Sequence, residues 1–270
     1  MNKTIGFIGC GNMAKAMIGG LVRSNIINED NIIASARTKE TLEKVRNEYK
    51  IRTTLDNKTV AREADYLIIA VKPYMHEDVL KEINKEINKN STVITIAAGI
   101  SIGYMKRLLG EDIKIVKAMP NTPAMVGEGV TALAFDIGIE EASKLEIENI
   151  FNSFGRTEIL DESLIDGFTA LCGSSPAYVY MMIEAMADGG VLQGIPRNQA
   201  YTMAAQAVLG SAKMVLETGL HPGELKDNVC SPKGTTIEAV AKLEEKGFRS
   251  AIIEAMRVCA EKSRQLTKHN

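Results

Sequence analysis

The pattern of hydrophobic and polar positions divides the chain into two parts with different periodicities. Up to about residue 160, short apolar runs alternate with stretches of helical spacing. Runs that are apolar throughout and separated by helices are typical of a parallel sheet covered on both faces. The predicted strands are 5–8, 32–35, 66–71, 92–97, 113–118, 129–134 and 157–160, and the predicted helices are 12–23, 39–49, 76–87, 102–109 and 140–154.

Beyond Leu160 the strand pattern stops and helical periodicity continues alone. The predicted helices are 177–191, 197–216, 235–246 and 248–266, separated by segments of Gly and Pro that start or stop helices. Small residues are frequent in 185–190 and 204–207, as expected of closely packed helices. The pattern therefore predicts an α/β domain at 1–160 followed by an all-α domain at 161–270.

Composition and charge narrow the class of protein. Hydrophobic residues make up 45% of the 270 positions and charged residues 24%, which is the balance of a globular chain with a real core. The net charge of −2, without a basic stripe, disfavours a nucleic-acid or anionic-membrane partner. The apolar runs fall short of the roughly 20 residues that cross a bilayer.

The cysteines and the first residues point to a reducing compartment. The four cysteines lack any C-x-x-C pair, so we expect neither a zinc site nor a disulfide framework. Met1–Thr4 leads directly into the first predicted strand and leaves no room for a signal peptide. We expect a cytoplasmic protein without a metal, a membrane partner or a nucleic-acid partner.

A glycine-rich turn joins the first predicted strand to the first predicted helix. The turn fits G-x-G-x-x-A, with Gly9 allowing the tight turn, Gly11 leaving room for a pyrophosphate and Ala14 allowing close packing. The amides at the helix start, at Asn12 and Met13, would face the phosphates. This predicts a Rossmann-type dinucleotide-binding domain, although a purely structural glycine turn remains the alternative.

The end of the second predicted strand bears on which dinucleotide is bound. An NAD-selective domain would carry an Asp or Glu there, but the strand ends at Ser35 and Arg37 without an acid. A carboxylate would repel a 2′-phosphate, whereas a hydroxyl and a guanidinium can bind it. We therefore expect NADPH as the cofactor, with NADH as the second choice. The alternative is that Arg37 is only a solvent-exposed loop residue.

Three further segments lie where predicted strands end, at the edge where open α/β sheets bind ligands. They are residues 70–73, 97–100 and 118–123. Pro73 stops its strand, and Gly99 would let the backbone approach the cofactor. Each segment alone also fits an ordinary transition from strand to loop.

Together with motifs of the second half, these segments resemble one family, the pyrroline-5-carboxylate reductases. The further motifs lie at 171–178, 187–190, 221–223, 225–229 and 231–236. The resemblance runs from Gly6 to about Leu266, and the most specific segment is 231–236 with its continuation to Val240. Lys233 departs from the pattern, because small residues are commoner at that position.

The resemblance implies the fold, the partners and the activity. It implies an N-terminal Rossmann domain and an all-α C-terminal dimerisation domain that interlocks with a second subunit, with five dimers as a larger assembly. The active site would lie between the cofactor domain of one chain and the helical domain of its partner. The reaction would transfer hydride from NADPH to the C=N bond of 1-pyrroline-5-carboxylate, giving L-proline as the last step of proline synthesis.

The predicted site residues, taken from the glycine-rich motif, the helix start at 234–236 and the family resemblance, fall into a cofactor group and a substrate group. The cofactor group is Gly9, Gly11, Asn12, Met13, Ser35, Arg37, Asn57, Ala70, Val71, Lys72, Pro73, Ile96, Ala97, Ala98 and Asn228, and the substrate group is Glu162, Gly234, Thr235 and Thr236. Ser35 and Arg37 would hold the adenosine ribose. Residues 70–73 and 96–98 would line the nicotinamide side.

The segment 231–238 allows two interpretations, one structural and one functional. Thr235 and Glu238 fit a capping box, which would make Thr235 a helix cap. The amides of Gly234, Thr235 and Thr236 would also form an anion site for the substrate carboxylate. Thr236 is the predicted catalytic residue, its hydroxyl bonding the imine nitrogen.

The chemistry does not require a histidine acid, because an imine can arrive partly protonated and the cofactor supplies the hydride. His221 is therefore interpreted as a residue that starts a helix.

Two other functions remain open. A β-hydroxyacid dehydrogenase would use a catalytic Lys with an Asn four residues later, but Lys213 is followed by Glu217 and is expected on a helix surface. A non-catalytic NADP-binding regulator would bind the cofactor without oxidising it.

Overall fold

A computed structural model of the chain describes residues 1 and 3–268. The described chain divides into two compact units, one of residues up to Ser174 together with those from Cys259 onward, and one of residues 175–258. The division thus falls at Ser174 and again after Val258, and not near Leu160. The later segment joins the first unit because Ser263 Oγ donates to Asp166 Oδ1 at 2.5 Å. Whether 1–160 and 161–270 fold as separate domains stays a prediction.

The described residues of the first unit form an eight-stranded sheet with the order β3-β2-β1-β4-β5-β6-β7-β8. The strands are β1 (Ile5–Ile8), β2 (Ile32–Ser35), β3 (Arg52–Thr54), β4 (Tyr66–Ile69), β5 (Thr92–Thr95), β6 (Lys114–Met119), β7 (Gly129–Phe135) and β8 (Gly155–Ile159). β1 pairs in parallel with β2 and β4, and β5 in parallel with β4 and β6.

The sheet is mostly parallel, as predicted, but β7, for which the sequence indicated a strand without a direction, runs antiparallel to β6. A parallel connection needs a crossover of a dozen or more residues. Residues 120–128 form only a loop with a 3₁₀ turn at Thr122–Val126, so the chain returns beside β6 in the opposite direction. β8 then pairs in parallel with β7.

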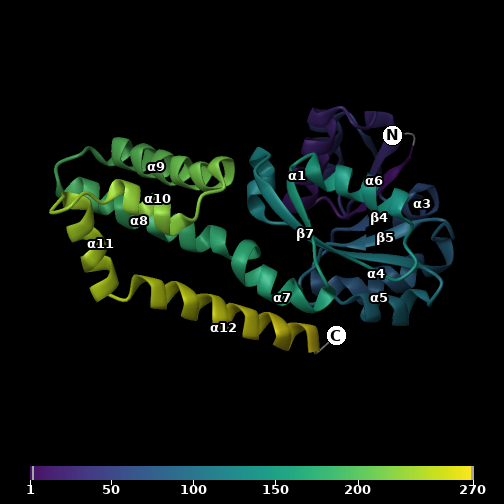
Figure 1. Cartoon of the computed structure of the whole chain (residues 1–270). Helices are drawn as coiled ribbons and strands as arrows, with labels where there is room; N and C mark the ends of the chain where they lie inside the picture. The colour runs from purple at the N-terminus through teal and green to yellow at the C-terminus, as the bar shows by residue number, and fades with distance from the viewer. Residues whose placement is uncertain (2, 269–270) are drawn as a thin grey trace. The chain divides into compact units, whose positions relative to one another are not determined.

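Helices cover both faces of the sheet, as predicted (Figure 1). They are α1 (Asn12–Ser24), α2 (Lys39–Tyr49), α3 (Asn57–Glu63), α4 (His76–Ile83), α5 (Ile102–Leu109), α6 (Glu141–Asn152) and α7 (Ile165–Phe168). One apolar core joins α1, α2 and α6 to the sheet, around fully buried Phe7, Met17 and Phe151. A second core joins α3, α4 and α5 to the opposite face, around Leu67, Leu80 and Met105.

Four short elements were not predicted: β3, α3, α7 and α10 (Pro222–Val229). None is long enough to show a clear hydrophobic period. Local contacts define them instead. The Asp56 side chain, for example, accepts hydrogen bonds from the amides of Lys58 and Thr59 and so starts α3. The chain continues from α7 into a π-helical turn at Thr169–Gly173.

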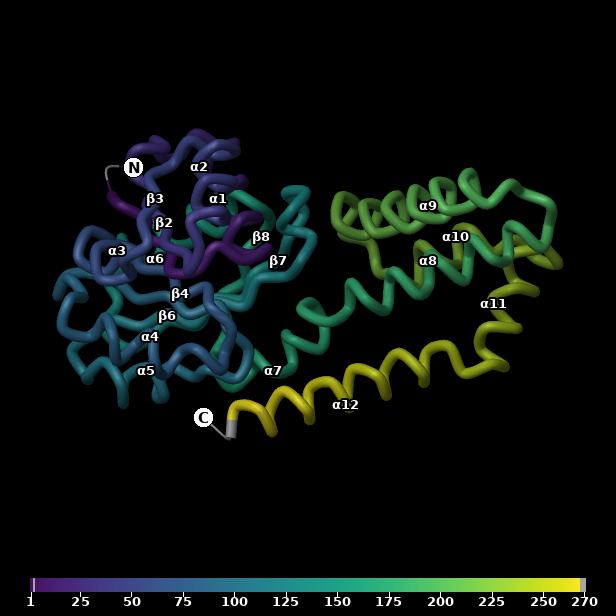
Figure 2. The backbone as a smooth tube through the Cα atoms, turned by 180° about the vertical axis from the view of Figure 1, so that it is seen from behind, coloured from purple at the N-terminus to yellow at the C-terminus, as the bar shows by residue number. Residues whose placement is uncertain are grey.

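The second unit consists of helices. They are α8 (Ser175–Leu192), α9 (Arg197–Thr218), α10, α11 (Thr235–Glu245) and the first part of α12 (Phe248–Lys268). α8 and α9 lie side by side (Figures 1 and 2). Ala187 of α8 and Ala200 and Ala204 of α9 are buried. Close packing of helices therefore accounts for Ala187 and Ala204, whereas Ala185, Ala205 and Ala207 of the same predicted segments are exposed in the single chain.

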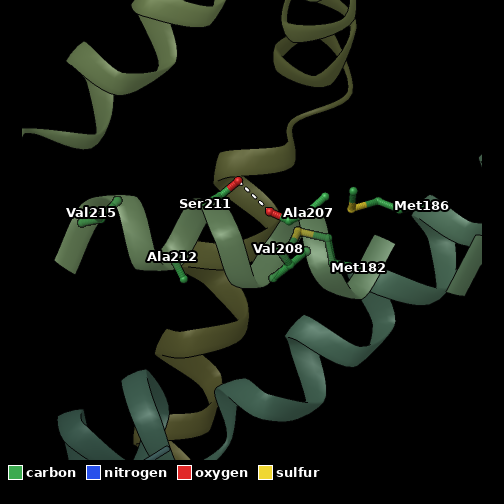
Figure 3. A pocket seen from close by; sticks show the side chains of 7 residues that line it. All are labelled: Met182, Met186, Ala207, Val208, Ser211, Ala212 and Val215. Carbon is green, nitrogen blue, oxygen red and sulfur yellow. Dashed lines mark hydrogen bonds between the residues drawn. The ribbon is translucent and has the colours of Figure 1, made fainter. Parts of the chain in front are cut away.

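This helical unit leaves large apolar side chains exposed. Leu192 is 84% exposed, Leu216 74% and Met181 70%. An apolar groove also runs between α8 and α9 (Figure 3), lined by Met182, Met186, Ala207, Val208, Ser211, Ala212 and Val215. Ser211, the hydroxyl residue in the groove, donates to the Ala207 carbonyl oxygen at 2.8 Å, so the surface is chemically apolar. Contiguous apolar surface of this kind marks an interaction site.

Candidate active site

The glycine-rich turn after β1 has the geometry that its sequence predicts. Gly9 has φ +103°, and a Cβ at this position would lie 2.9 Å from the Ala70 carbonyl oxygen. Its amide donates to the Ser35 carbonyl oxygen at 3.0 Å. At Gly11 a Cβ would meet nothing within 4 Å, so the turn is open on that side. Gly9 is therefore required by the fold, whereas Gly11 leaves space beside the turn.

The start of α1 presents unpartnered amides to this space. Gly11 is the N-cap, no side chain caps the helix, and the first turn holds no acid. The first four amides of a helix have no partner within it, and together with the helix dipole they favour an anion. Cys10 does not add a charge, because burial raises the pKa of its thiol to about 11. The turn and the helix start thus fit a pyrophosphate.

The turn lies at the point where the strand order reverses. β2 and β3 follow on one side of β1, whereas β4 and β5 follow on the other. Dinucleotides bind across such a switch point, at the carboxyl ends of the strands. Residues 70–73 and 96–98 leave β4 and β5 at this edge, on the side opposite to Arg37. The sheet therefore provides two half-sites, one at β2 and one at β4 and β5.

Ser35 and Asn57, which were both expected to contact the cofactor directly, are hydrogen-bonded to each other. The Ser35 side chain is fully buried, and its hydroxyl donates to Asn57 Oδ1 at 2.7 Å. The Asn57 amide in turn donates to Glu82 Oε2 at 2.9 Å. A hydroxyl directed at Asn57 does not face a 2′-phosphate, so the expected Ser35 contact does not fit this geometry.

The Arg37 side chain is available to bind a phosphate. It follows β2, is exposed, and makes neither a hydrogen bond nor an ion pair with any described residue. A free guanidinium can bind a phosphate with two parallel hydrogen bonds. Because the acid of NAD-selective sheets is missing beside it, the half-site at β2 suits a 2′-phosphate.

Glu162 and Lys117 hold the segment that follows β5. Lys117 is buried within β6, and its ammonium donates to the Ile100 carbonyl oxygen. Burial lowers the pKa of Lys117, while the carboxylates of Glu162 and Asp166 oppose that shift. Glu162 Oε1 accepts from the Ile102 amide at 2.7 Å, at the start of α5. The carboxylate expected to bind substrate thus contacts the backbone here.

Gly99, which follows β5, has a neighbour that the sequence did not predict. It has φ +77°, and a Cβ on it would lie 3.4 Å from the backbone of Leu266 in α12. The glycine thus lies beside the C-terminal helix. That its backbone also approaches the cofactor stays a prediction.

The start of α11 carries the predicted substrate residues. Gly234 is the N-cap and no side chain caps the helix, so the capping box expected at Thr235 is wrong: Thr235 is the first helical residue. The Gly234 amide donates to the Ser231 carbonyl oxygen at 3.0 Å and is not free for an anion. The amides of Thr235 and Thr236, at the first two helical positions, remain without a described partner.

The turn before α11 also shows why small residues are commoner at the position of Lys233. This residue has φ +57°, a left-handed conformation that costs little for glycine and more for a lysine. A Cβ on the following Gly234 would lie 2.3 Å from Ser231 Oγ and 3.0 Å from the Ser231 carbonyl oxygen, so a side chain there would require Ser231 to move.

Three other predicted residues of the helical unit lie on its surface. His221 Nδ1 accepts from the Gly223 amide at 3.0 Å, which confirms that it starts a helix. Lys213 is exposed and lies 3.4 Å from Glu217, as expected of a helix-surface residue. Asn228, predicted to reach the cofactor, is exposed on α10.

Two buried ionisable residues, Lys117 and His76, were missed by the sequence analysis. Lys117 gave a signal, a lysine inside an otherwise apolar strand; His76 gave none, because it stands among polar neighbours at a helix start. Among the described residues, no group of three or more His, Cys, Asp or Glu side chains is placed to hold a metal ion. Within the same residues, no helix has both the length and the apolar character needed to cross a membrane.

A sheet of this strand order, with a glycine-rich turn at its switch point, defines a dinucleotide-binding protein of the Rossmann type. Family models support both parts of the chain. A model described as NADP oxidoreductase, coenzyme F420-dependent, matches residues 4–99, and one for pyrroline-5-carboxylate reductase dimerisation matches residues 162–266.

Similarity to individual proteins extends over the whole chain. The pyrroline-5-carboxylate reductase of Escherichia coli is 50% identical over 99% of this chain and 100% of its own. A crystal structure from Plasmodium falciparum with NADP bound matches with a TM-score of 0.89 and 32% identity over 98% of both chains. A structure from Coxiella burnetii matches with a TM-score of 0.93 and 31% identity over 99% of both. The chain belongs to the pyrroline-5-carboxylate reductase family, which confirms the resemblance and the fold class.

Proposed function

We propose that the protein reduces the C=N bond of 1-pyrroline-5-carboxylate with NADPH, giving L-proline. The observation that carries this proposal is the open glycine-rich turn at the switch point, in a chain that matches reductases of this name from end to end. NADPH is proposed over NADH because Arg37 is free at the end of β2 and no acid stands beside it. The Plasmodium relative carries NADP in its structure.

Bound NADPH supplies the hydride, and the chain supplies binding and orientation. The amides of Asn12 and Met13 hold the pyrophosphate at the start of α1, and Arg37 binds the 2′-phosphate. Residues 70–73 and 96–98 form the surface for the nicotinamide half. Correct placement of the reacting atoms can supply a large part of the rate enhancement at such a site.

The substrate is proposed to bind at the start of α11. The free amides of Thr235 and Thr236, with the positive end of the helix dipole, suit its carboxylate. The Thr236 hydroxyl then hydrogen-bonds the ring nitrogen as the imine becomes an amine. Asn228 of the helical unit is proposed to contact the cofactor, as the family resemblance implies.

The protein is further proposed to be a homo-oligomer, at least a dimer, paired through its helical unit. The apolar groove between α8 and α9 and the match to a dimerisation model support this. A cytoplasmic location and a pentamer of dimers stay predictions.

The reaction is tested by following NADPH absorbance with 1-pyrroline-5-carboxylate, with a six-membered cyclic imine, and in reverse with small hydroxyacids and NADP. We expect oxidation of NADPH with the five-membered imine. Hydroxyacid oxidation without imine reduction would instead indicate a β-hydroxyacid dehydrogenase. Cofactor binding without any turnover would indicate a regulator.

Replacing Thr236 by valine is expected to lower kcat/KM by roughly 10- to 100-fold. The side chain keeps its shape but loses a hydroxyl, and a buried partner left unsatisfied costs about 1–3 kcal/mol. If the hydrogen bond from the Thr236 hydroxyl to the ring nitrogen strengthens as hydride arrives, its loss lowers kcat itself. NADPH affinity and melting temperature should change little.

The matched control for this variant is Thr202→Val, on the surface of α9 in the same unit. It removes an exposed hydroxyl far along the chain from α11, so turnover should stay at the wild-type value. Normal turnover in Thr236→Val would assign that residue to the helix start alone.

A further inference from the structure

His76, the first residue of α4, lies between segments that leave two neighbouring strands. Its side chain is fully buried. Nδ1 lies 3.2 Å from the carbonyl oxygen of Lys72, which follows β4, and Nε2 lies 3.1 Å from Oγ1 of Thr95, the last residue of β5. The imidazole therefore bridges the ends of β4 and β5.

The directions of these hydrogen bonds follow from the chemistry of the partners. A carbonyl oxygen can only accept, so Nδ1 carries the proton and donates to Lys72. Nε2 of the neutral ring then accepts from the Thr95 hydroxyl, and Thr95 Oγ1 also accepts from the Ala97 amide at 3.4 Å. Burial lowers the pKa of His76 and favours the neutral ring; the hydrogen bond to Lys72 opposes this shift, and the charge of Lys117 adds to it.

The two segments would otherwise be weakly joined beyond the strand ends. The backbone bond from the Ile96 amide to the Ile69 carbonyl oxygen is already long, at 3.5 Å. Farther along the second segment, Lys117 holds the Ile100 carbonyl oxygen and Glu162 holds the Ile102 amide. The segment after β5 is thus anchored, and His76 attaches the segment after β4 to it.

The location of this bridge gives it a role. The glycine-rich turn and Arg37 occupy the β1 and β2 side of the switch point, which leaves the carboxyl ends of β4 and β5 for the nicotinamide half of a dinucleotide. We propose that His76 is a positioning residue for the nicotinamide: it ties residues 70–73 to residues 96–98 and so holds both sides of the surface on which the ring lies. This inference rests on the proposed function, because it assumes that a nicotinamide cofactor binds there.

Variants of His76 can remove the two hydrogen bonds separately. His76→Asn keeps a donor near the position of Nδ1, toward Lys72, and His76→Gln keeps a polar group near the position of Nε2, toward Thr95. His76→Leu removes both bonds at similar volume. The matched control is Ile83→Val, which alters a fully buried residue of the same helix away from both segments.

Two ligands then distinguish positioning from stability. NADPH carries a nicotinamide, whereas adenosine 2′,5′-bisphosphate carries only the adenosine half with its phosphates. In His76→Leu we expect NADPH affinity to fall about 10-fold, as two neutral hydrogen bonds imply, with the bisphosphate affinity within about two-fold of wild type. kcat should fall as well, and His76→Asn and His76→Gln should each recover part of both losses.

A role in stability alone predicts a different result. His76→Leu would then melt earlier but bind both ligands and turn over as the wild type does, which would overturn the proposal. Equal losses for the two ligands would overturn it too. If His76→Leu does not fold, the Asn and Gln variants provide the same comparison of ligands.

Thr95→Val tests the other end of the bridge. Combined with His76→Leu it should weaken NADPH binding by less than the sum of the two single losses, because both changes break the bond between His76 and Thr95, and only Thr95→Val also removes the acceptor of the Ala97 amide. Fully additive losses would contradict that shared bond. If His76→Leu weakens the binding of NADPH more than that of the bisphosphate, but the wild type does not reduce the imine, the proposed reaction is refuted and the role of His76 stands.

Discussion

Replacing Arg37 by alanine is expected to weaken NADPH binding by roughly 10- to 150-fold and to leave NADH binding nearly unchanged. Arg37 is exposed at the end of β2 and makes no hydrogen bond or ion pair with the described residues, so its guanidinium is free to bind a phosphate. A charge-assisted hydrogen bond of this kind contributes about 1.5–3 kcal/mol. Because Ser35 is buried and bonded to Asn57, Arg37 carries the expected selectivity without it.

Direct titration of the variant with each cofactor, at two salt concentrations, measures this effect. Lys89→Ala is the control: it removes one exposed positive charge from the loop before β5. That loop lies at the amino ends of the parallel strands, whereas Arg37 lies at their carboxyl ends. An unchanged NADPH affinity in Lys89→Ala would show that net charge is not responsible. Equal losses of NADPH and NADH in Arg37→Ala would show that the residue does not recognise the 2′-phosphate.

Much of the fold could be predicted because local signals and the global arrangement agree. Strands β1, β2, β4 and β5 are buried at every position and appear in the sequence as apolar runs. The direction of β7 was not predictable in the same way, because hydrophobicity does not encode strand direction. It depends on how few residues join β6 to β7.

The site was predictable where one residue type satisfies a backbone requirement. Gly9 is such a position, since its positive φ and its distance to Ala70 both exclude a side chain. Roles that depend on where a side chain points were not predictable. Ser35 has a hydroxyl at the expected position in the chain, but alternation along β2 turns it inward to Asn57. Thr235 likewise has a capping-box spacing, yet the helix begins one residue earlier than a cap at Thr235 would require.

The division of the chain into two units near the C-terminus was likewise not predictable from local sequence patterns. Periodicity describes α12 as one uninterrupted helix, and the structure agrees. Its final residues nevertheless belong to the first unit, through Ser263 bonded to Asp166 and Leu266 beside Gly99. Ser263 and Asp166 are 97 positions apart, and Leu266 and Gly99 are farther apart still, so no local pattern reports either contact.

The charged substitution Met186→Asp is expected to abolish the active oligomer. Met186 lies in the apolar groove between α8 and α9 (Figure 3), where large apolar residues are exposed in the single chain. In a two-fold interface each substitution occurs twice, and a buried charge without a partner costs about 3–5 kcal/mol. One such charge corresponds to roughly 150- to 5,000-fold weaker association.

Sedimentation at micromolar concentration, combined with the NADPH assay, tests this expectation. The wild type should show no folded, active monomer, whereas Met186→Asp should sediment as a monomer with little activity. The control is Ile137→Asp, an equally drastic change at a residue that is 97% exposed in the first unit, in the turn between β7 and α6. Since Ile137 lies outside the helical unit, that variant should keep both the oligomer and the activity. A fully active monomer, in either the wild type or Met186→Asp, would refute an active site completed by a partner chain. The dinucleotide site at the β1 turn would still stand, because every residue assigned to that turn lies in the first unit.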